Sequence, residues 1–182
     1  MLQKPAEDHC VGDVGNVEFI EADESPAPRS TLGHRSERAL QSIFSELADV
    51  EEEHQPLDVE GRKIPYRKRA GGLVWFDFAV LCEGPRSAAD YVDIARRFHT
   101  VLLSNVPRLS PVNADAARRF TWMVDVFYDV RVKLVVSAEA VPEEIFTDGG
   151  DAKIAGAEFA RAVSRLHEMQ STTYLQAERA RN

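Results

Sequence analysis

Two apolar runs of strand length, separated by one amphipathic stretch, constrain the fold of this chain more than any other feature. The runs cover residues 99–106 (HTVLLSNV) and 131–138 (RVKLVVSA). Between them, residues 113–129 carry apolar side chains at helical spacing, and Asn113 is the expected helix cap. Strand, helix and strand in this order predict a βαβ unit with parallel strands over about residues 99–138.

Further elements are predicted on both sides of this unit. We expect an amphipathic helix over 36–49, short β-strands within 57–81, a helix over 86–98 capped by Ser87, a short helix opening at Pro142, and a long final helix over 157–177. Pro65 would confine its strand to a sheet edge or a bulge. The predicted fold class is therefore α/β, with a small mixed sheet flanked by helices.

The charge divides the chain into a head and a body. Residues 1–60 hold four Lys/Arg against 15 Asp/Glu, whereas residues 61–182 hold 18 against 15. Residues 1–35, which are also rich in Pro, Gly and Ser, are predicted to form a poorly ordered acidic head with room for one strand, followed by the folded portion 36–182. No nucleic acid partner is expected, because phosphates require Lys/Arg neutralisation.

One short basic run departs from this acidic balance. It contains Arg62, Lys63, Arg67, Lys68 and Arg69. The run could contact nucleic acid or an acidic protein, or it could be a solvated strand edge protected by charge, and the second interpretation is favoured.

Targeting signals are not apparent in this sequence. None of its apolar runs reaches the length of a membrane span, and the opening MLQKPAEDHC lacks the apolar core of a signal peptide. Cys10 and Cys82 form neither a disulfide framework nor a metal pair. We therefore expect a cytoplasmic protein that binds no metal of its own.

Familiar catalytic motifs are also missing, and sheet geometry indicates a candidate site instead. Neither the phosphate-binding pattern G-x-x-x-x-G-K-S/T nor the nucleophile elbow G-x-S-x-G occurs. Ligands of open parallel sheets bind beyond the carboxyl ends of the strands. Ser104 and Asn105 end one apolar run, and Ser137 and Glu139 end the other, so these side chains either share a crevice or satisfy backbone groups.

Three arginines are further candidates for a charged site. Arg118 and Arg119 lie early in the 113–129 helix, and since adjacent helical residues point about 100° apart, at most one of them faces the core. The other could stabilise a phosphoryl group as an arginine finger or pair with Asp115. Arg165, in SRLHEM, allows the same two interpretations.

Three stretches of the chain resemble one protein family. They are DYVDIARRFHTVLLSNVP, DAARRFTWMVDVFYDVRVKLVVSAEAVPEEIF and FARAVSRLHEMQSTTYL. Their order and spacing resemble the carboxyl-terminal third of the ZapE-like ATPases, from roughly Gly72 to Leu175. The family patterns R-F-H-T, D-E-A-R-R-F and S-R-L-x-E-M-Q-S fall on residues 97–100, 115–120 and 164–171, with Ala116 in place of the acid.

This resemblance implies a part of an ATPase of the P-loop, AAA-like kind. ATP and Mg²⁺ are implied for the full-length family, whereas the phosphate- and Mg²⁺-binding motifs are absent from this chain, so no cofactor is expected for the chain alone. The implied partners are the missing ATPase core and a protein of the cell-division ring, with protein quality control as the other family role. Arg118 or Arg119 would meet nucleotide or a neighbouring subunit, and Asn105, Glu139 and Arg165 are the further candidates for binding it. The alternatives are a stand-alone protein-binding module and a small enzyme that works in the crevice of Asn105 and Glu139.

Overall fold

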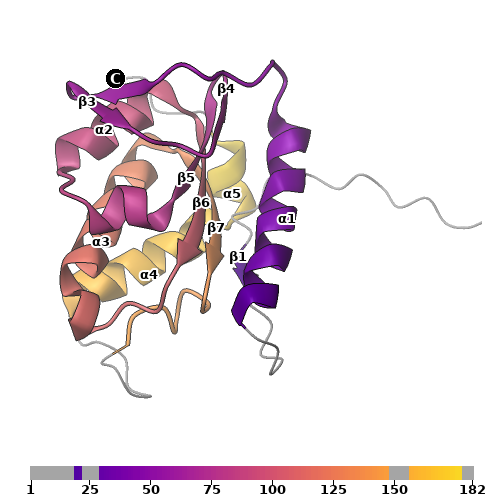
Figure 1. Ribbon diagram of the computed structural model, residues 1–182. Coiled ribbons are helices and arrows are strands. Elements are labelled where there is room, and N and C mark those ends of the chain that lie inside the picture. Colours follow the sequence, from indigo (N-terminus) through magenta and orange to yellow (C-terminus); the bar gives the residue numbers. More distant parts are fainter. Residues whose placement is uncertain (1–18, 22–28, 148–155, 178–182) are drawn as a thin grey trace, which may run out of the picture.

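A five-stranded sheet forms the centre of the molecule (Figure 1). The computed structural model describes residues 19–21, 29–147 and 156–177, with side chains from residue 36 onward. The strands lie in the order β1-β7-β6-β5-β4, where β1 is Phe19–Glu21, β4 is Lys68–Ala70, β5 is Leu73–Asp77, β6 is Thr100–Val106 and β7 is Lys133–Ala138. The α/β prediction is confirmed, and the sheet is mixed because β4 pairs antiparallel with β5 while the other pairs are parallel.

The predicted βαβ unit is present in the structure. Helix α3 (Ala114–Val130) connects β6 to β7, and α2 (Ala88–Arg97) connects the neighbouring parallel pair β5 and β6 in the same way. Because the strands are parallel, the carboxyl ends of β5, β6 and β7 all reach one edge of the sheet. We call this end of the sheet, at which the parallel strands finish, the carboxyl edge.

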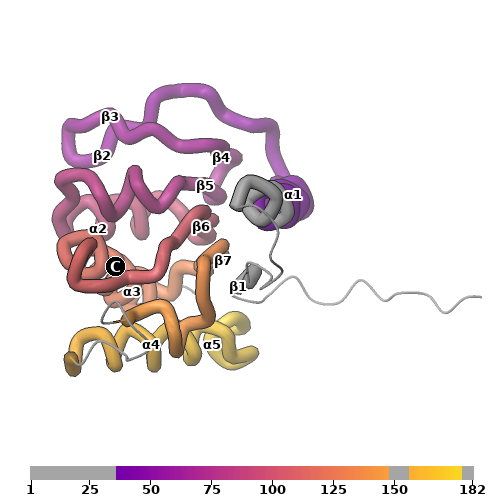
Figure 2. Tube along the Cα trace, turned by 60° about the horizontal axis from the view of Figure 1, so that its bottom comes forward, coloured from indigo at the N-terminus to yellow at the C-terminus, as the bar shows by residue number. Residues whose placement is uncertain are grey.

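Helices cover both faces of the sheet, as Figure 2 shows. Helix α1 (Arg29–Leu47) lies on one face and buries Leu40 and Phe44 against Trp75, Leu102 and neighbouring side chains. On the other face, α2 and α3 build the larger core together with α4 (Ala157–Met169) and α5 (Thr172–Gln176). None of the helices in the described ranges is long and apolar enough to cross a bilayer.

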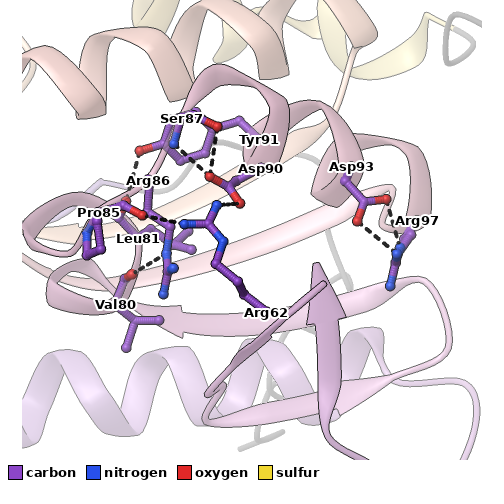
Figure 3. Close-up of polar contacts among 10 residues, drawn as sticks. All are labelled: Arg62, Val80, Leu81, Pro85, Arg86, Ser87, Asp90, Tyr91, Asp93 and Arg97. Atoms are coloured by element: carbon purple, nitrogen blue, oxygen red, sulfur yellow. Dashed lines mark hydrogen bonds and ion pairs between the residues drawn. The ribbon is translucent and has the colours of Figure 1, made fainter. Parts of the chain in front are cut away.

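A separate hairpin of β2 (Leu57–Val59) and β3 (Arg62–Ile64) is fastened onto α2. Glu60 and Gly61 both have positive φ, at 50° and 72°, which suits the two-residue turn of a hairpin. Arg62 forms an ion pair with the fully buried carboxylate of Asp90 and donates to the Pro85 carbonyl (2.8 Å; Figure 3). The hairpin thus covers α2 through the Arg62–Asp90 ion pair, through a hydrogen bond from Arg97 of α2 to the Asp58 carbonyl, and through its apolar side chains.

Most of the basic run forms ion pairs within the protein. Arg67, Lys68 and Arg69 lie in or next to the edge strand β4 and pair with acidic groups of α1, β5 and the preceding loop. The backbone N–H of Glu53 also donates to the Arg69 carbonyl (2.7 Å), so the loop covers the outer side of this strand. These contacts are those of a strand edge protected by charge, and the expected absence of a nucleic-acid partner stays a prediction.

Several predicted boundaries are wrong. Helix α1 begins at Arg29 rather than at residue 36, and Pro65 lies between β3 and β4 rather than inside a strand. The β region ends at β5, after which η1 (Ala79–Glu83) forms a π-helical turn. The division of the chain at residue 35 stays a prediction, because residues 1–18 and 22–28 lie outside the described residues.

The carboxyl-terminal predictions also need correction. The segment that follows Pro142 forms turns instead of a helix, and Phe146 then bridges to Leu109. The predicted final helix is divided into α4 and α5 by a turn. Ser171 lies at the end of this turn, and its side chain accepts from the Tyr174 backbone N–H (3.2 Å) and so caps α5. Asn113 occupies the expected N-cap position of α3, yet its side chain accepts from the Ser110 N–H and does not cap the helix.

Candidate functional site

An interlocked polar group lies at the carboxyl edge, centred on Asp77 at the end of β5. Its Oδ2 accepts from Arg67 (2.9 Å) and from the Asn105 side-chain amide (2.7 Å), and its Oδ1 accepts from the Ala79 N–H (3.2 Å). Arg67 also pairs with Glu37 of α1 (2.5 Å). The group therefore joins four parts of the chain, which are α1, β5, β6 and the segment that leads into β4.

The charge balance of this group keeps Arg67 firmly protonated. Partial burial alone would lower the pKa of Arg67, but hydrogen bonds and the charges of Asp77 and Glu37 outweigh burial and raise its pKa. The guanidinium also lies 5.6 Å from the centroid of the Trp75 ring. Asp77 and Arg67 are thus ion-paired with one another. Glu37, Arg67 and Asn105 are the exposed members of the group, and Asp77 is half-buried.

Asn105 has a backbone conformation that few residues adopt. Its φ is +63°, and the pairing of β6 with β7 shifts register between Leu103 and Val106. Asparagine tolerates the left-handed region better than most residues. The bulge turns the Asn105 amide toward Asp77 of the neighbouring strand.

The four side chains predicted at the strand ends divide into an exposed pair and a buried pair. Asn105 and Glu139 are exposed on neighbouring strands, but their side chains have different partners: Glu139 accepts from the Arg108 N–H (3.1 Å). Ser104 and Ser137 are buried, and the Ser104 hydroxyl accepts from the Trp75 indole (3.1 Å), as expected for a structural role. A nucleotide contact of Asn105 or Glu139 stays a prediction.

Asp77 was missed by sequence reasoning, although a signal was present. It is the polar residue that ends the apolar run LVWFD, in the same way that Asn105 ends the next strand. The register pairs Asp77 with Ser104. Applying the strand-end argument to three strands instead of two would have included it.

The two adjacent arginines of α3 point in different directions. Arg119 turns inward and donates to the Cys82 carbonyl of η1 (3.0 Å). The two preceding carbonyls of the same turn accept from Arg86 Nε (3.0 Å) and from the Tyr91 hydroxyl (2.8 Å). Arg118 is exposed over 53% of its side chain, and its contact with Asp115 is 3.9 Å long. Arg119 therefore holds η1, and Arg118 remains accessible.

Arg165 lies away from the carboxyl edge. It pairs with Asp125 (2.7 Å) and Asp129 (3.4 Å) of α3 and lies 4.8 Å from the centroid of the Tyr128 ring. Since α3 runs from the carboxyl edge back to the amino ends of the strands, these partners belong to its far half. The geometry gives Arg165 a role in attaching α4 to α3, and its contact with nucleotide stays a prediction.

Neither the sequence patterns nor the described side chains point to a Mg²⁺–nucleotide site, and the expected absence of a cofactor from the isolated chain stays a prediction. The sequence holds no G-x-x-x-x-G-K-S/T pattern to cradle phosphates. Within the described ranges, acidic, histidine and cysteine side chains nowhere form a group of three that could hold a metal ion. The carboxylate of Asp77 is already bonded to Arg67.

Comparisons with known proteins identify relatives of this chain. The model of the AFG1-like ATPase family matches residues 14–178. The cell division protein ZapE of Escherichia coli is 37% identical over 150 residues, which are 82% of this chain and 39% of the relative. An uncharacterised protein of Schizosaccharomyces pombe is 40% identical over 111 residues, 60% of this chain and 24% of the relative.

A third relative extends the range of organisms. Lactation elevated protein 1 homolog B of Danio rerio is 38% identical over 117 residues, 63% of this chain and 23% of the relative. The comparison with solved structures gave no match. The chain thus spans at most about two fifths of the curated relatives that it matches. Because the family model covers nearly all of it, the chain belongs to the AFG1-like ATPase family.

Proposed function

We propose that this chain is the carboxyl-terminal module of an AFG1-like ATPase and couples nucleotide state to a protein partner. The observation that carries the proposal is a mismatch: the chain belongs to an ATPase family, yet its sequence lacks the phosphate-binding loop and it spans 39% of ZapE. ATP and Mg²⁺ would then be held by the remainder of the longer protein. Catalysis by this chain would need that remainder.

The polar group around Asp77 supports a coupling role. It ties four segments of the chain together at one edge of the sheet, so a displacement of any one of them changes the contacts of the others. By analogy with its Escherichia coli relative, which is named a cell division protein, the partner would be a protein of cell division. The buried free thiol of Cys82 is consistent with a reducing, cytoplasmic location.

Calorimetry of the chain with Mg²⁺–ATP, together with a phosphate-release assay, tests the first half of the proposal. We expect neither binding nor turnover by the isolated chain. Clear binding would instead support a nucleotide site within the chain, and the crevice of Asn105 and Glu139 would be the first place to examine it. The alternative of an independent small enzyme would then be favoured.

A chimera tests the second half. The segment of Escherichia coli ZapE that matches this chain would be replaced by the chain itself, and phosphate release would be measured. If the chain is an ATPase module, the chimera hydrolyses ATP, and Asp77→Asn reduces the rate because the carboxyl edge loses its central charge. An inactive but folded chimera would favour the stand-alone protein-binding module.

A further inference from the structure

We propose that the outward side of α3 is a docking surface for the nucleotide-binding segment of the same AFG1-like protein. We define this α3 face by Asp115, Arg118 and Trp122, which follow one another at helical spacing of three and four residues. The inference rests on the proposed function. It adds the surface through which the two segments meet.

The first observation is the distribution of exposed apolar side chains. Among the described residues, large apolar side chains are exposed at Val50, Val112 and Trp122. Trp122 lies on the α3 face with 40% of its surface exposed, and Val112, which is 96% exposed, lies on the turn that leads into α3. Tryptophan and arginine are the residues most enriched at the centres of protein interfaces, and both occur here one helical turn apart.

The second observation is the state of Arg118. Its nearest carboxylate oxygen, on Asp115, is 3.9 Å away, and the Asp115 side chain is itself 79% exposed. By contrast, Arg165 on the neighbouring helix reaches its carboxylate at 2.7 Å. The guanidinium of Arg118 therefore keeps most of its donors for a partner. A matching surface would offer an apolar pocket for the indole and a carboxylate for the guanidinium.

The third observation concerns which surfaces the chain itself covers. Helix α1 covers one face of the sheet, the loop at Glu53 covers the outer side of β4, and α4 packs against α3 through Arg161 and Arg165. The α3 face has no such cover among the described residues. The relatives contain more than half of their length outside the matched segment, and this added chain is the occupant that we assign to the face.

Hydroxyl-radical footprinting of Trp122 tests the assignment directly. The oxidation rate of this indole would be compared between the free chain and the folded ZapE chimera described above. We expect the rate to fall severalfold in the chimera. Arg118→Glu should return the oxidation rate toward that of the free chain, because the new carboxylate has the same sign as the carboxylate that we expect on the partner surface. Val50→Ala, at an exposed apolar side chain outside the face, is the matched control and should leave the protection unchanged.

The outcomes separate this proposal from the proposed function. An unchanged Trp122 rate in a chimera that hydrolyses ATP would overturn the docking surface and leave the function intact. Protection of Trp122 in an inactive chimera would support the surface and not the function. If the free chain dimerises in sedimentation and Trp122 is already protected, a second copy occupies the face, and the assignment is wrong.

Discussion

Asp90 is the charged residue whose removal we expect to destabilise the fold most. Its side chain is fully buried, and its carboxylate accepts from Arg62, from the Ser87 backbone N–H (2.6 Å) and from the Ser87 hydroxyl (3.0 Å; Figure 3). The residue thus closes the first turn of α2 and fastens the β2–β3 hairpin to it. Asp90→Asn keeps the shape of the side chain and removes its charge.

The magnitude follows from the two sides of the ion pair. Breaking a buried ion pair costs about 3–5 kcal/mol, and a hydrogen bond to a charged group contributes about 1.5–3 kcal/mol. Arg62 is 44% exposed and can return to water, and the asparagine oxygen can still accept one of the bonds. We therefore expect a loss of about 3 kcal/mol in the free energy of unfolding, at the lower end of that range.

Urea unfolding at neutral pH, followed by circular dichroism, measures this loss. Asp93→Asn is the matched control, because it makes the same change one turn further along α2. Asp93 pairs with Arg97 at (i, i+4) spacing (2.8 Å), and its side chain is 17% exposed. Exposed pairs of this spacing contribute about 0.3–0.5 kcal/mol. Because the Asp93 carboxylate bonds to Arg97, whereas Asp90 also accepts twice from Ser87, we expect a smaller loss in Asp93→Asn than in Asp90→Asn. Equal losses in the two variants, or a loss below about 0.5 kcal/mol in Asp90→Asn, would refute the reasoning.

The pH dependence gives an independent check. Burial alone would raise the pKa of Asp90, but hydrogen bonds from Ser87 and Arg62 and the charge of Arg62 outweigh it and lower the pKa. A group whose pKa is lowered on folding stabilises the protein above its unfolded pKa, about 3.9 for aspartate, and loses that contribution as the pH falls through the folded value. The stability difference between the wild type and Asp90→Asn should therefore shrink on acidification below about pH 4.

Three further substitutions or modifications test other parts of the structure. Tyr174→Phe should lower the free energy of unfolding by about 1–2 kcal/mol, because the buried hydroxyl lies 3.2–3.4 Å from three carbonyls at the end of α3; thermal melting would show it. Asn105→Gly and Asn105→Ala both lose the hydrogen bond to Asp77, but only glycine adopts a φ of +63° without strain, so the alanine variant should be the less stable of the two by about 1–2 kcal/mol; similar melting curves for the two would contradict the strain argument. Burial raises the pKa of the Cys82 thiol, so peptide-level mass spectrometry should find Cys82 unlabelled by a maleimide until the chain unfolds.

The sequence pattern was sufficient for the elements that bury apolar side chains continuously. Strands β6 and β7 and helix α3 lie within a few residues of their predicted bounds, because a continuous apolar run and an apolar stripe at helical spacing can both be read from the order of the side chains. The pattern was insufficient where backbone geometry decides the outcome. No periodicity in the sequence marks the π-helical turn η1. Its carbonyls accept hydrogen bonds from side chains of α2, of α3 and of the segment between η1 and α2.

The candidate site shows the same limit. Strand ends predicted the position of Asn105 at the carboxyl edge, because parallel strands end at one edge of the sheet, whereas its role in binding stays a prediction. They were not a guide to the burial of Ser104, which depends on the indole of Trp75 on the neighbouring strand. Nor could helical spacing decide which of Arg118 and Arg119 faces inward, since that choice depends on where η1 places the Cys82 carbonyl.

The family patterns acquire a structural meaning once these contacts are known. Within S-R-L-x-E-M-Q-S, Arg165 attaches α4 to α3, and Ser171 caps α5, which positions the Tyr174 hydroxyl at the end of α3. Within the arginine pair, Arg119 holds η1. Because these side chains are already committed to the fold, a likeness in the patterns alone does not locate a contact with nucleotide. Arg118 is the candidate that the fold leaves accessible, and for this reason we assign the meeting with the rest of the ATPase to its side of α3.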